Sequence, residues 1–215
     1  MAHLFPFAAV LLLATQPLYA ESAVVEVPVI GLPCQGCDEV FIRMPDRLSS
    51  QARIAATDQP GQALSIEGVV RDQAGKVAAG VIVYAYHTDA DGIYPNANRT
   101  RGASGSRHGD LRGWARTDAQ GRYRFDTIRP ASYPDTAIPQ HVHMHIIEPD
   151  CCTYYIDDIV FTDDPLLTER ARNAPAKRGG RGVVTPIRDA QGVWSVTRDI
   201  VLGQGIADYG KAKGR

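Results

Sequence analysis

Short segments that are either rich in apolar residues or alternate apolar with polar ones recur along the chain. Residues 64–70 and 81–87 are rich in β-branched and aromatic side chains, whereas residues 123–128 and 193–196 alternate apolar and polar positions. Both patterns are typical of β-strands, because a strand turns successive side chains to opposite faces of a sheet. These four segments are therefore predicted to be strands.

A turn signature of the form Asp-x-x-Gly occurs four times, at residues 72–75, 89–92, 118–121 and 189–192. Asp can accept a hydrogen bond from the backbone two residues later, and Gly adopts the positive φ angle that a tight turn needs. Short strands separated by such turns predict an all-β fold, namely an antiparallel β-sandwich with long loops and little helix. The best helix candidate is residues 165–172, which begin with a proline.

The N-terminus has the pattern of an export signal. Residues 1–20 contain no Asp, Glu, Lys or Arg and centre on an apolar run that is too short to cross a bilayer. The small residue Ala20 precedes polar residues, as at a signal peptidase site. We expect an exported protein, periplasmic or secreted after cleavage near Ala20, with no membrane segment in its mature form. An uncleaved membrane anchor is the alternative.

The remainder of the chain is long enough for one domain with a substantial core. We expect an irregular, Pro-rich N-terminal arm over residues 21–60, the β-sandwich over residues 61–203, and a polar tail over residues 204–215. The ends are expected to be less well anchored than the core. The 23 basic and 24 acidic residues nearly balance, which argues against a nucleic-acid partner and favours a small molecule or another protein. The oligomeric state is left open.

The chain has four cysteines, Cys34, Cys37, Cys151 and Cys152. Export makes them candidates for disulfides, so we expect at least one bond, although four cysteines allow three pairings and the sequence does not choose among them. A zinc site is the alternative for Cys34 and Cys37. It is disfavoured because the only other cysteines are adjacent and chelate poorly.

Three histidines, His141, His143 and His145, alternate with apolar residues over residues 141–146. In a strand these imidazoles lie on one face and the intervening apolar residues mark the opposite face as core. Imidazole is the commonest metal ligand among side chains, so the pattern favours a metal site. The alternative is a solvated strand face that happens to carry histidines.

Two tyrosines upstream, Tyr94 and Tyr133, are each followed by a proline. Proline restricts the backbone of the preceding residue and disfavours helix there. Each Tyr-Pro pair alone is typical of a turn with an aromatic lid. The short spacing between Tyr133 and His141 makes the tyrosines candidates for the same site as the histidines.

These motifs, in this order, resemble the intradiol ring-cleavage dioxygenases, the family of catechol and protocatechuate 3,4-dioxygenases. The resemblance covers about residues 63 to 165 and rests on residues 68–72, 86–94, 112–113, 117–125, 127–130, 133–134 and 139–143. It implies an Fe(III) ion with Tyr94 and His141 as equatorial ligands and Tyr133 and His143 as axial ligands. His145 has no ligand role in that pattern, so we expect it to be structural or to lie behind the ligands.

The resemblance also implies an enzyme. Its substrates would be a small aromatic diol and O₂, and the ring would be cleaved between the two carbons that bear hydroxyl groups. Two phenolates stabilise ferric over ferrous iron, and a bound cation lowers a tyrosine pKa far enough to deprotonate it. The family pattern assigns Tyr133 a second role, in which it leaves the iron and accepts a catechol proton.

Two positions depart from the family pattern. The family usually has Arg three residues before the first histidine, where this chain has Ile138, and Gln at or near the position of Asp158. Among the arginines that could compensate, Arg112, Arg116 and Arg129, we favour Arg129 because it lies four residues before Tyr133. An exposed turn arginine is its alternative role. An apolar Ile138 and an acidic Asp158 favour uncharged catechols.

Two other functions compete with this hypothesis. Residues 64–88 also resemble carboxypeptidase regulatory-like and transthyretin-like domains, which would make the protein a non-catalytic exported binding module without a metal. A zinc or copper site on the histidines, with hydrolytic or redox activity, is the third possibility. A metal analysis with a visible spectrum distinguishes the three.

Overall fold

The computed structural model of the protein describes residues 27–31, 36–96 and 107–214. The predicted signal peptide and Cys34 lie outside these ranges, so their predictions stay predictions. Within the described ranges, no helix has both the length and the apolar character needed to cross a membrane.

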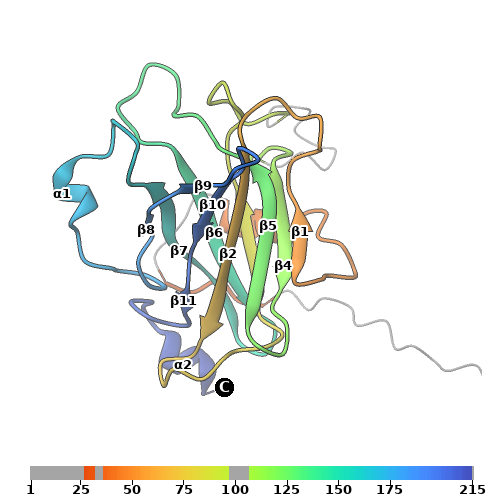
Figure 1. Ribbon diagram of the computed structural model, residues 1–215. Helices are drawn as coiled ribbons and strands as arrows, with labels where there is room; N and C mark the ends of the chain where they lie inside the picture. The colour runs from red at the N-terminus through yellow and green to blue at the C-terminus, as the bar shows by residue number, and fades with distance from the viewer. Residues whose placement is uncertain (1–26, 32–35, 97–106, 215) are drawn as a thin grey trace, which may run out of the picture.

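Two β-sheets pack face to face (Figure 1). The first sheet contains β1 (Gln51–Arg53), β2 (Ala63–Arg71), β5 (Arg122–Ile128), β9 (Ile187–Arg188), β10 (Trp194–Thr197) and β11 (Ile200–Val201). Its order is β1-β5-β2-β10-β9, and β11 also pairs with β2. The second sheet contains β3 (Ile82–Tyr86), β4 (Arg112–Arg116), β6 (His141–Glu148), β7 (Cys152–Phe161) and β8 (Val183–Val184), in the order β4-β3-β6-β7-β8.

The predicted β-sandwich is confirmed, and each of the four predicted strands is present as β2, β3, β5 or β10. The long strands pair antiparallel, as expected for strands that follow one another through turns. The short strands β1, β8, β10 and β11 instead join a neighbour in parallel. Parallel pairing needs a long return connection, which the loops of this chain provide, so both sheets are mixed rather than purely antiparallel.

All four predicted turns are present with one hydrogen-bonding pattern. In each turn the Asp carboxylate accepts the amide two residues later, and the Asp carbonyl accepts the Gly amide. The four glycines have φ angles between 72° and 85°. The positive φ explains why Gly ends each signature.

Helix is scarce, as predicted. The described residues form a 3₁₀ turn η1 (Cys37–Phe41) and two short helices, α1 (Glu169–Arg172) and α2 (Tyr209–Lys213). The helix predicted over residues 165–172 begins only after Thr168, whose side chain accepts the Ala171 amide. The preceding residues form a turn instead, because Asp164 accepts two backbone amides there.

The two faces of β6 have different surroundings. Val142, Met144 and Ile146 are fully buried in the core between the sheets, as the alternation predicted. The opposite face of the second sheet carries a separate buried cluster, which includes Tyr84, Tyr86 and Trp114 and is covered by N-terminal residues such as Val27 and Val40. The histidines of β6 lie on this covered face.

The N-terminal arm and the C-terminal tail are both anchored. Trp114 Nε1 donates to the Val40 carbonyl over 2.7 Å, which ties the arm to the second sheet. In the tail, Tyr209 and Lys213 contact the buried Glu148 carboxylate at 3.2 and 2.7 Å. These contacts and the buried Ile206 hold the tail against the core, although most of its side chains are exposed.

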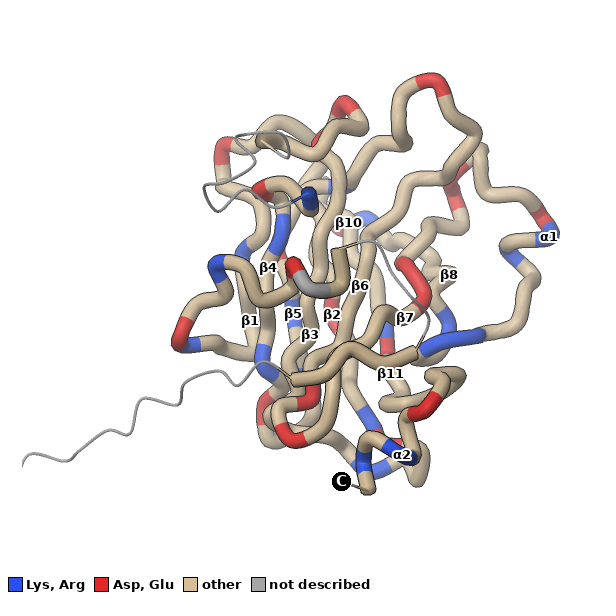
Figure 2. The backbone as a smooth tube through the Cα atoms, turned by 180° about the vertical axis from the view of Figure 1, so that it is seen from behind, with Lys and Arg blue, Asp and Glu red and all other residues tan. Residues whose placement is uncertain are grey.

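Basic and acidic residues are interspersed over the described chain (Figure 2). Several form exposed ion pairs, such as Arg43 with Asp110 and Arg124 with Asp126. Exposed pairs of this kind contribute little stability. The mixed distribution agrees with the near-zero net charge.

Candidate metal centre

The histidines of β6 share one face of the second sheet, as their spacing predicted. His141 and His145 are 8% and 1% exposed, and His143 is partly buried. His143 lies opposite Tyr86 of β3 in the sheet register, and their rings stack with centroids 4.5 Å apart. The neighbouring strand therefore forms an aromatic wall beside His143.

Tyr94 and Tyr133 lie on two loops that the fold joins together. The Thr88 hydroxyl donates to the Ala131 carbonyl over 2.7 Å, and the Ala131 amide donates to the Asp89 carbonyl over 2.9 Å. Gly92 lies so close to the second loop that a Cβ atom on it would be 2.0 Å from the Ser132 carbonyl oxygen. The Asp-x-x-Gly turn at residues 89–92 thus holds Tyr94 against Tyr133.

Four side chains from these segments converge. The Tyr133 hydroxyl lies 2.6 Å from the Tyr94 hydroxyl, 3.1 Å from His141 Nε2 and 3.3 Å from His143 Nε2. The structure therefore brings together all four residues that were predicted as metal ligands, although they come from three separate parts of the chain.

Both histidines direct Nε2 into the cluster. His141 Nδ1 lies 2.7 Å from the Pro139 carbonyl, and His143 Nδ1 lies 3.0 Å from a carboxylate oxygen of Asp158. A carbonyl or carboxylate oxygen can only accept, so each Nδ1 carries the proton. The Nε2 lone pairs are then free to bind a metal, which is the usual arrangement of histidine ligands.

Burial disfavours the charged forms of Tyr94, Tyr133 and His141 unless a cation is present. Burial raises the pKa of Tyr94 and of Tyr133 above the ordinary value. Burial, together with the charge of His143, lowers the pKa of His141. The neutral His141 imidazole is ready to bind a metal, whereas the phenols lose their protons only if a strong positive charge replaces the lost solvation.

The part of the chain that carries the four converging side chains also matches a known protein family. The family model described as Dioxygenase matches residues 40–202, which include all four converging side chains. The chain belongs to the intradiol dioxygenase family.

Two curated relatives illustrate the similarity. The chain is 30% identical over 112 residues to the protocatechuate 3,4-dioxygenase beta chain of Burkholderia cepacia, covering 50% of this chain and 48% of the relative. It is 26% identical over 157 residues to catechol 1,2-dioxygenase 2 of Acinetobacter lwoffii, covering 60% and 55%. The chain thus spans about half the length of these relatives.

Solved structures of intradiol dioxygenases share the fold. Catechol 1,2-dioxygenase from Pseudomonas arvilla C-1 matches with a TM-score of 0.57 at 23% identity, over 78% of this chain and 60% of that one. The dioxygenase domain of a carbohydrate-binding fusion from Streptomyces sp. SirexAA-E matches with a TM-score of 0.53 at 23% identity, over 76% and 97%. At this identity the likeness establishes the fold.

His145 lies behind the four converging residues. Its ring contacts Tyr84 and Tyr155 edge-on, with centroids 5.8 and 5.3 Å away. Neither ring nitrogen has a hydrogen-bond partner in the described chain, and burial lowers its pKa to about 3. His145 is therefore a neutral packing residue in this structure rather than a fifth member of the cluster.

Arg129, the arginine that was favoured to compensate for Ile138, is engaged elsewhere. Its guanidinium donates to both Asp163 carboxylate oxygens at 2.8 and 2.6 Å and to Gln140 at 2.8 Å. It also lies over the rings of Phe161 and Trp194. Its charge is therefore matched by Asp163, and no described contact joins it to the four donors.

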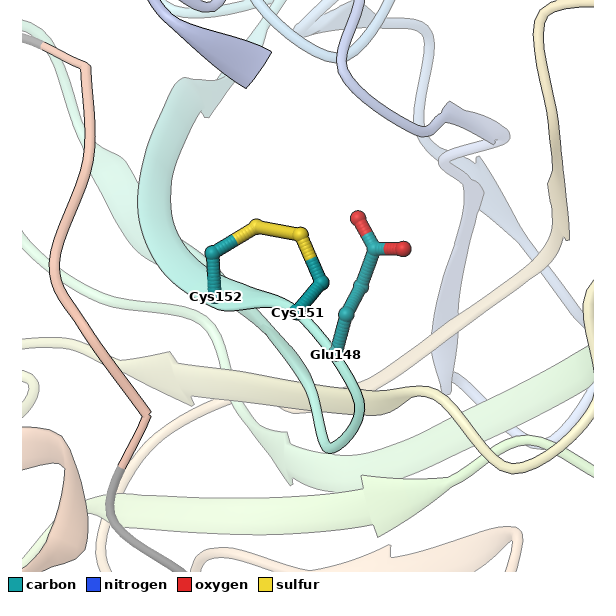
Figure 3. Close-up of side chains that lie close together, drawn as sticks. All are labelled: Glu148, Cys151 and Cys152. Carbon is teal, nitrogen blue, oxygen red and sulfur yellow. A yellow bond between two sulfur atoms is a disulfide. The ribbon is translucent and has the colours of Figure 1, made fainter. Parts of the chain in front are cut away.

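Within the described residues, a second group of side chains has potential ligand atoms close enough together to hold a metal ion: Glu148, Cys151 and Cys152 (Figure 3). The two cysteines form a disulfide, so neither provides a thiolate. Glu148 is bound by Tyr154, Tyr209 and Lys213. Cys37 is also disulfide-bonded, which contradicts the zinc alternative.

Sequence reasoning missed two neighbours of the centre. The role of Tyr86 depends on sheet register, and the contact between Asp158 and His143 depends on the pairing of β6 with β7. Asp158 was expected to influence the charge of the substrate, but its contact with His143 was not predicted, and its departure from the family pattern was the available signal.

Proposed function

We propose that the protein is an Fe(III) intradiol dioxygenase, which uses O₂ to cleave a catechol-type ring between its two hydroxyl-bearing carbons. One observation carries this proposal: the Tyr94 phenol oxygen and the Nε2 atoms of His141 and His143 all lie within 2.6 to 3.3 Å of the Tyr133 hydroxyl. Family membership agrees with it.

The donor set fits ferric iron. Phenolate is a hard anionic ligand, and two phenolates with two neutral imidazoles suit a trivalent ion better than the thiolate-rich sets of structural zinc sites. Burial keeps Tyr94 and Tyr133 protonated in the metal-free protein, so binding of the ion releases two protons. When bound, the ferric ion supplies Lewis-acid activation of a chelated diol.

Tyr133 has the geometry of the proton acceptor. Its hydroxyl contacts each of the other three donors, and it lies on the loop between β5 and β6 rather than within a strand. A side chain on a loop can move away while the strand histidines stay in place. In this proposal the Tyr133 oxygen accepts one proton from the arriving diol, and Tyr94, His141 and His143 hold their positions.

The substrate is proposed to be an uncharged aromatic diol. Ile138 is apolar and 47% exposed, and the Asp158 carboxylate lies beside His143. Among the described residues, no Lys or Arg forms a hydrogen bond or ion pair with the four donors. A ring carboxylate therefore lacks a matching cation and is repelled by Asp158.

Export is part of the proposal. The signal-like residues 1–20 favour it, and the disulfide between Cys151 and Cys152 is typical of an oxidising compartment. N-terminal sequencing of protein recovered from outside the cytoplasm tests this point. A first residue at or near Glu21 supports cleavage, whereas an intact Met1 contradicts it.

The central test is metal content with activity. Protein produced with ample iron should hold about one iron per chain, show a tyrosinate-to-iron charge-transfer band, and convert catechol to a muconate-type diacid with O₂ uptake. A metal-free, colourless sample would instead support the non-catalytic binding module. Stoichiometric zinc or copper would support the third possibility.

A further inference from the structure

The pairing of β6 with β7 is irregular at His143. Val142 pairs with Ile159, whereas Met144 pairs with Ile156, so the register shifts by one residue between them. His143 therefore faces two residues of β7, Asp157 and Asp158. This is a β-bulge, a feature that re-aims a side chain and is common beside functional sites.

The bulge directs the two aspartates to different partners. The Asp158 carboxylate lies 3.0 Å from His143 Nδ1, with both side chains less than a quarter exposed. The Tyr155 hydroxyl is its second partner. The Asp157 carboxylate instead accepts the backbone amides of Lys177 and Arg178 at 3.0 and 3.1 Å.

The chain after α1 holds the bulge in place. Gly182 packs so closely that a Cβ atom on it would be 2.0 Å from the Asp158 carbonyl oxygen. The Val160 amide donates to the Gly182 carbonyl over 3.0 Å. Arg178 lies over the Tyr155 ring, 4.5 Å from its centroid. Asp158 is thus fixed by contacts on both sides, and its position beside His143 does not depend on an exposed, mobile side chain.

We propose that Asp158 is a positioning residue for the iron centre: it fixes the orientation and tautomer of His143 and adds a negative charge next to the centre. This inference rests on the proposed function, because it assumes that His143 Nε2 binds the ion. The resemblance places a neutral Gln at or near this position in the family. A carboxylate in its place favours Fe(III) over Fe(II), because the ferric ion carries the larger charge.

The experiment compares three variants of the iron-loaded protein. Asp158→Asn keeps an oxygen acceptor for Nδ1–H but removes the charge, so it should retain iron. Its Fe(III)/Fe(II) affinity ratio should fall on the order of tenfold, equivalent to a rise of about 59 mV in the one-electron reduction potential. Asp158→Ala removes the acceptor as well and should bind Fe(III) roughly 10- to 100-fold more weakly. Asp157→Asn is the matched control and should change neither quantity.

Two results would overturn the role of Asp158: an Asp158→Asn potential equal to wild type, or an Asp158→Ala affinity equal to wild type. Wild-type protein that still shows iron and its charge-transfer band would leave the proposed function intact in either case. Wild-type protein that binds no iron would overturn both.

If the Asp158 variants do not fold, the wild-type protein loaded with diamagnetic Ga(III) provides a second measurement. Nitrogen-15 spectra of the imidazoles should show His143 protonated at Nδ1 and metal-bound at Nε2. An unprotonated His143 Nδ1 would contradict the proposal.

Discussion

At the scale of single residues, Tyr133 is central to the candidate site. Its hydroxyl is the common contact of Tyr94, His141 and His143. A ligand that also accepts a proton has to leave without disturbing the other three. The roles of ligand and base can therefore be separated by removing only the Tyr133 oxygen.

Tyr133→Phe should retain much of the iron and lose turnover on catechol by a hundredfold or more, because three donors remain while the proton acceptor is gone. Iron content and catechol-dependent O₂ uptake measure the two effects. Tyr209→Phe is the control, because it removes a hydroxyl that contacts Glu148 rather than any of the four donors. It should keep both iron and turnover. Unchanged turnover in Tyr133→Phe would reject the role of base.

The missing family arginine leads to a prediction about substrate charge. The wild-type protein should cleave catechol and an alkylcatechol faster than protocatechuate, because Ile138 offers no charge and Asp158 repels a ring carboxylate. Ile138→Arg should raise the rate on protocatechuate relative to catechol by about tenfold or more. Steady-state rates on the three diols test this, and faster cleavage of protocatechuate by the wild type would contradict it.

The role of Arg129 as a compensating cation stays a prediction. If its charge assists catalysis, Arg129→Ala should lower turnover on the order of a hundredfold without loss of iron. Asp163→Asn is the variant to compare with Arg129→Ala, because it releases the Arg129 guanidinium from its ion pair and should preserve or raise turnover. A lower thermal midpoint with normal turnover in Arg129→Ala would assign Arg129 to packing against Phe161 and Trp194 alone.

At the scale of elements, the site depends on the contact between two loops. Gly92 ends the turn that precedes Tyr94, and it packs against the Ser132 carbonyl beside Tyr133. Its φ of 79° and this close approach both require glycine. The turn therefore links the fold to the geometry of the centre.

Gly92→Ala should separate the two tyrosine loops and reduce iron binding, in addition to a strain of about 1 to 3 kcal/mol. Gly75→Ala is a matched control, because Gly75 ends the same kind of turn with a φ of 85° but has open space around it. It should lose similar stability and keep its iron. Iron content and urea unfolding of both variants decide the matter, and equal iron loss in the two would contradict the prediction.

At the scale of the whole molecule, three buried histidines couple stability to pH. Burial lowers the pKa of His87, His108 and His145 to about 4, 4 and 3. The folded protein keeps them neutral, whereas the unfolded chain protonates them below about pH 6.5. The stability from this source is complete above that pH and is lost as the pH falls.

In iron-free protein these three histidines should therefore contribute a loss of about 4 kcal/mol of unfolding free energy per pH unit near pH 5, since the unfolded chain binds about three more protons at them. Urea unfolding at pH 7, 6 and 5 measures the slope. His87→Gln, which removes a histidine that contacts Thr88 and Thr127 and none of the four donors, should reduce this contribution by about one third. A flat profile would show that these histidines are accessible to protons in the folded state.

Local patterns in the sequence determined much of the architecture. The Asp-x-x-Gly turns are specified by hydrogen bonds within five residues, and the alternation over residues 141–146 places His141 and His143 on one face of β6. These features depend on near neighbours along the chain, so they can be read from it directly. The order of the motifs along the chain, which is also a property of the sequence alone, identified the family.

Tertiary structure alone decided the surroundings of the site. The bulge that aims Asp158 at His143 exists only because β6 and β7 pair with a register shift, and Arg129 meets Asp163 across 34 residues. The tail is anchored because Glu148 of β6 lies beneath Tyr209. Each of these contacts joins segments that are distant in the chain. Their energies depend on which strands pair and in which register, and local propensity does not encode either.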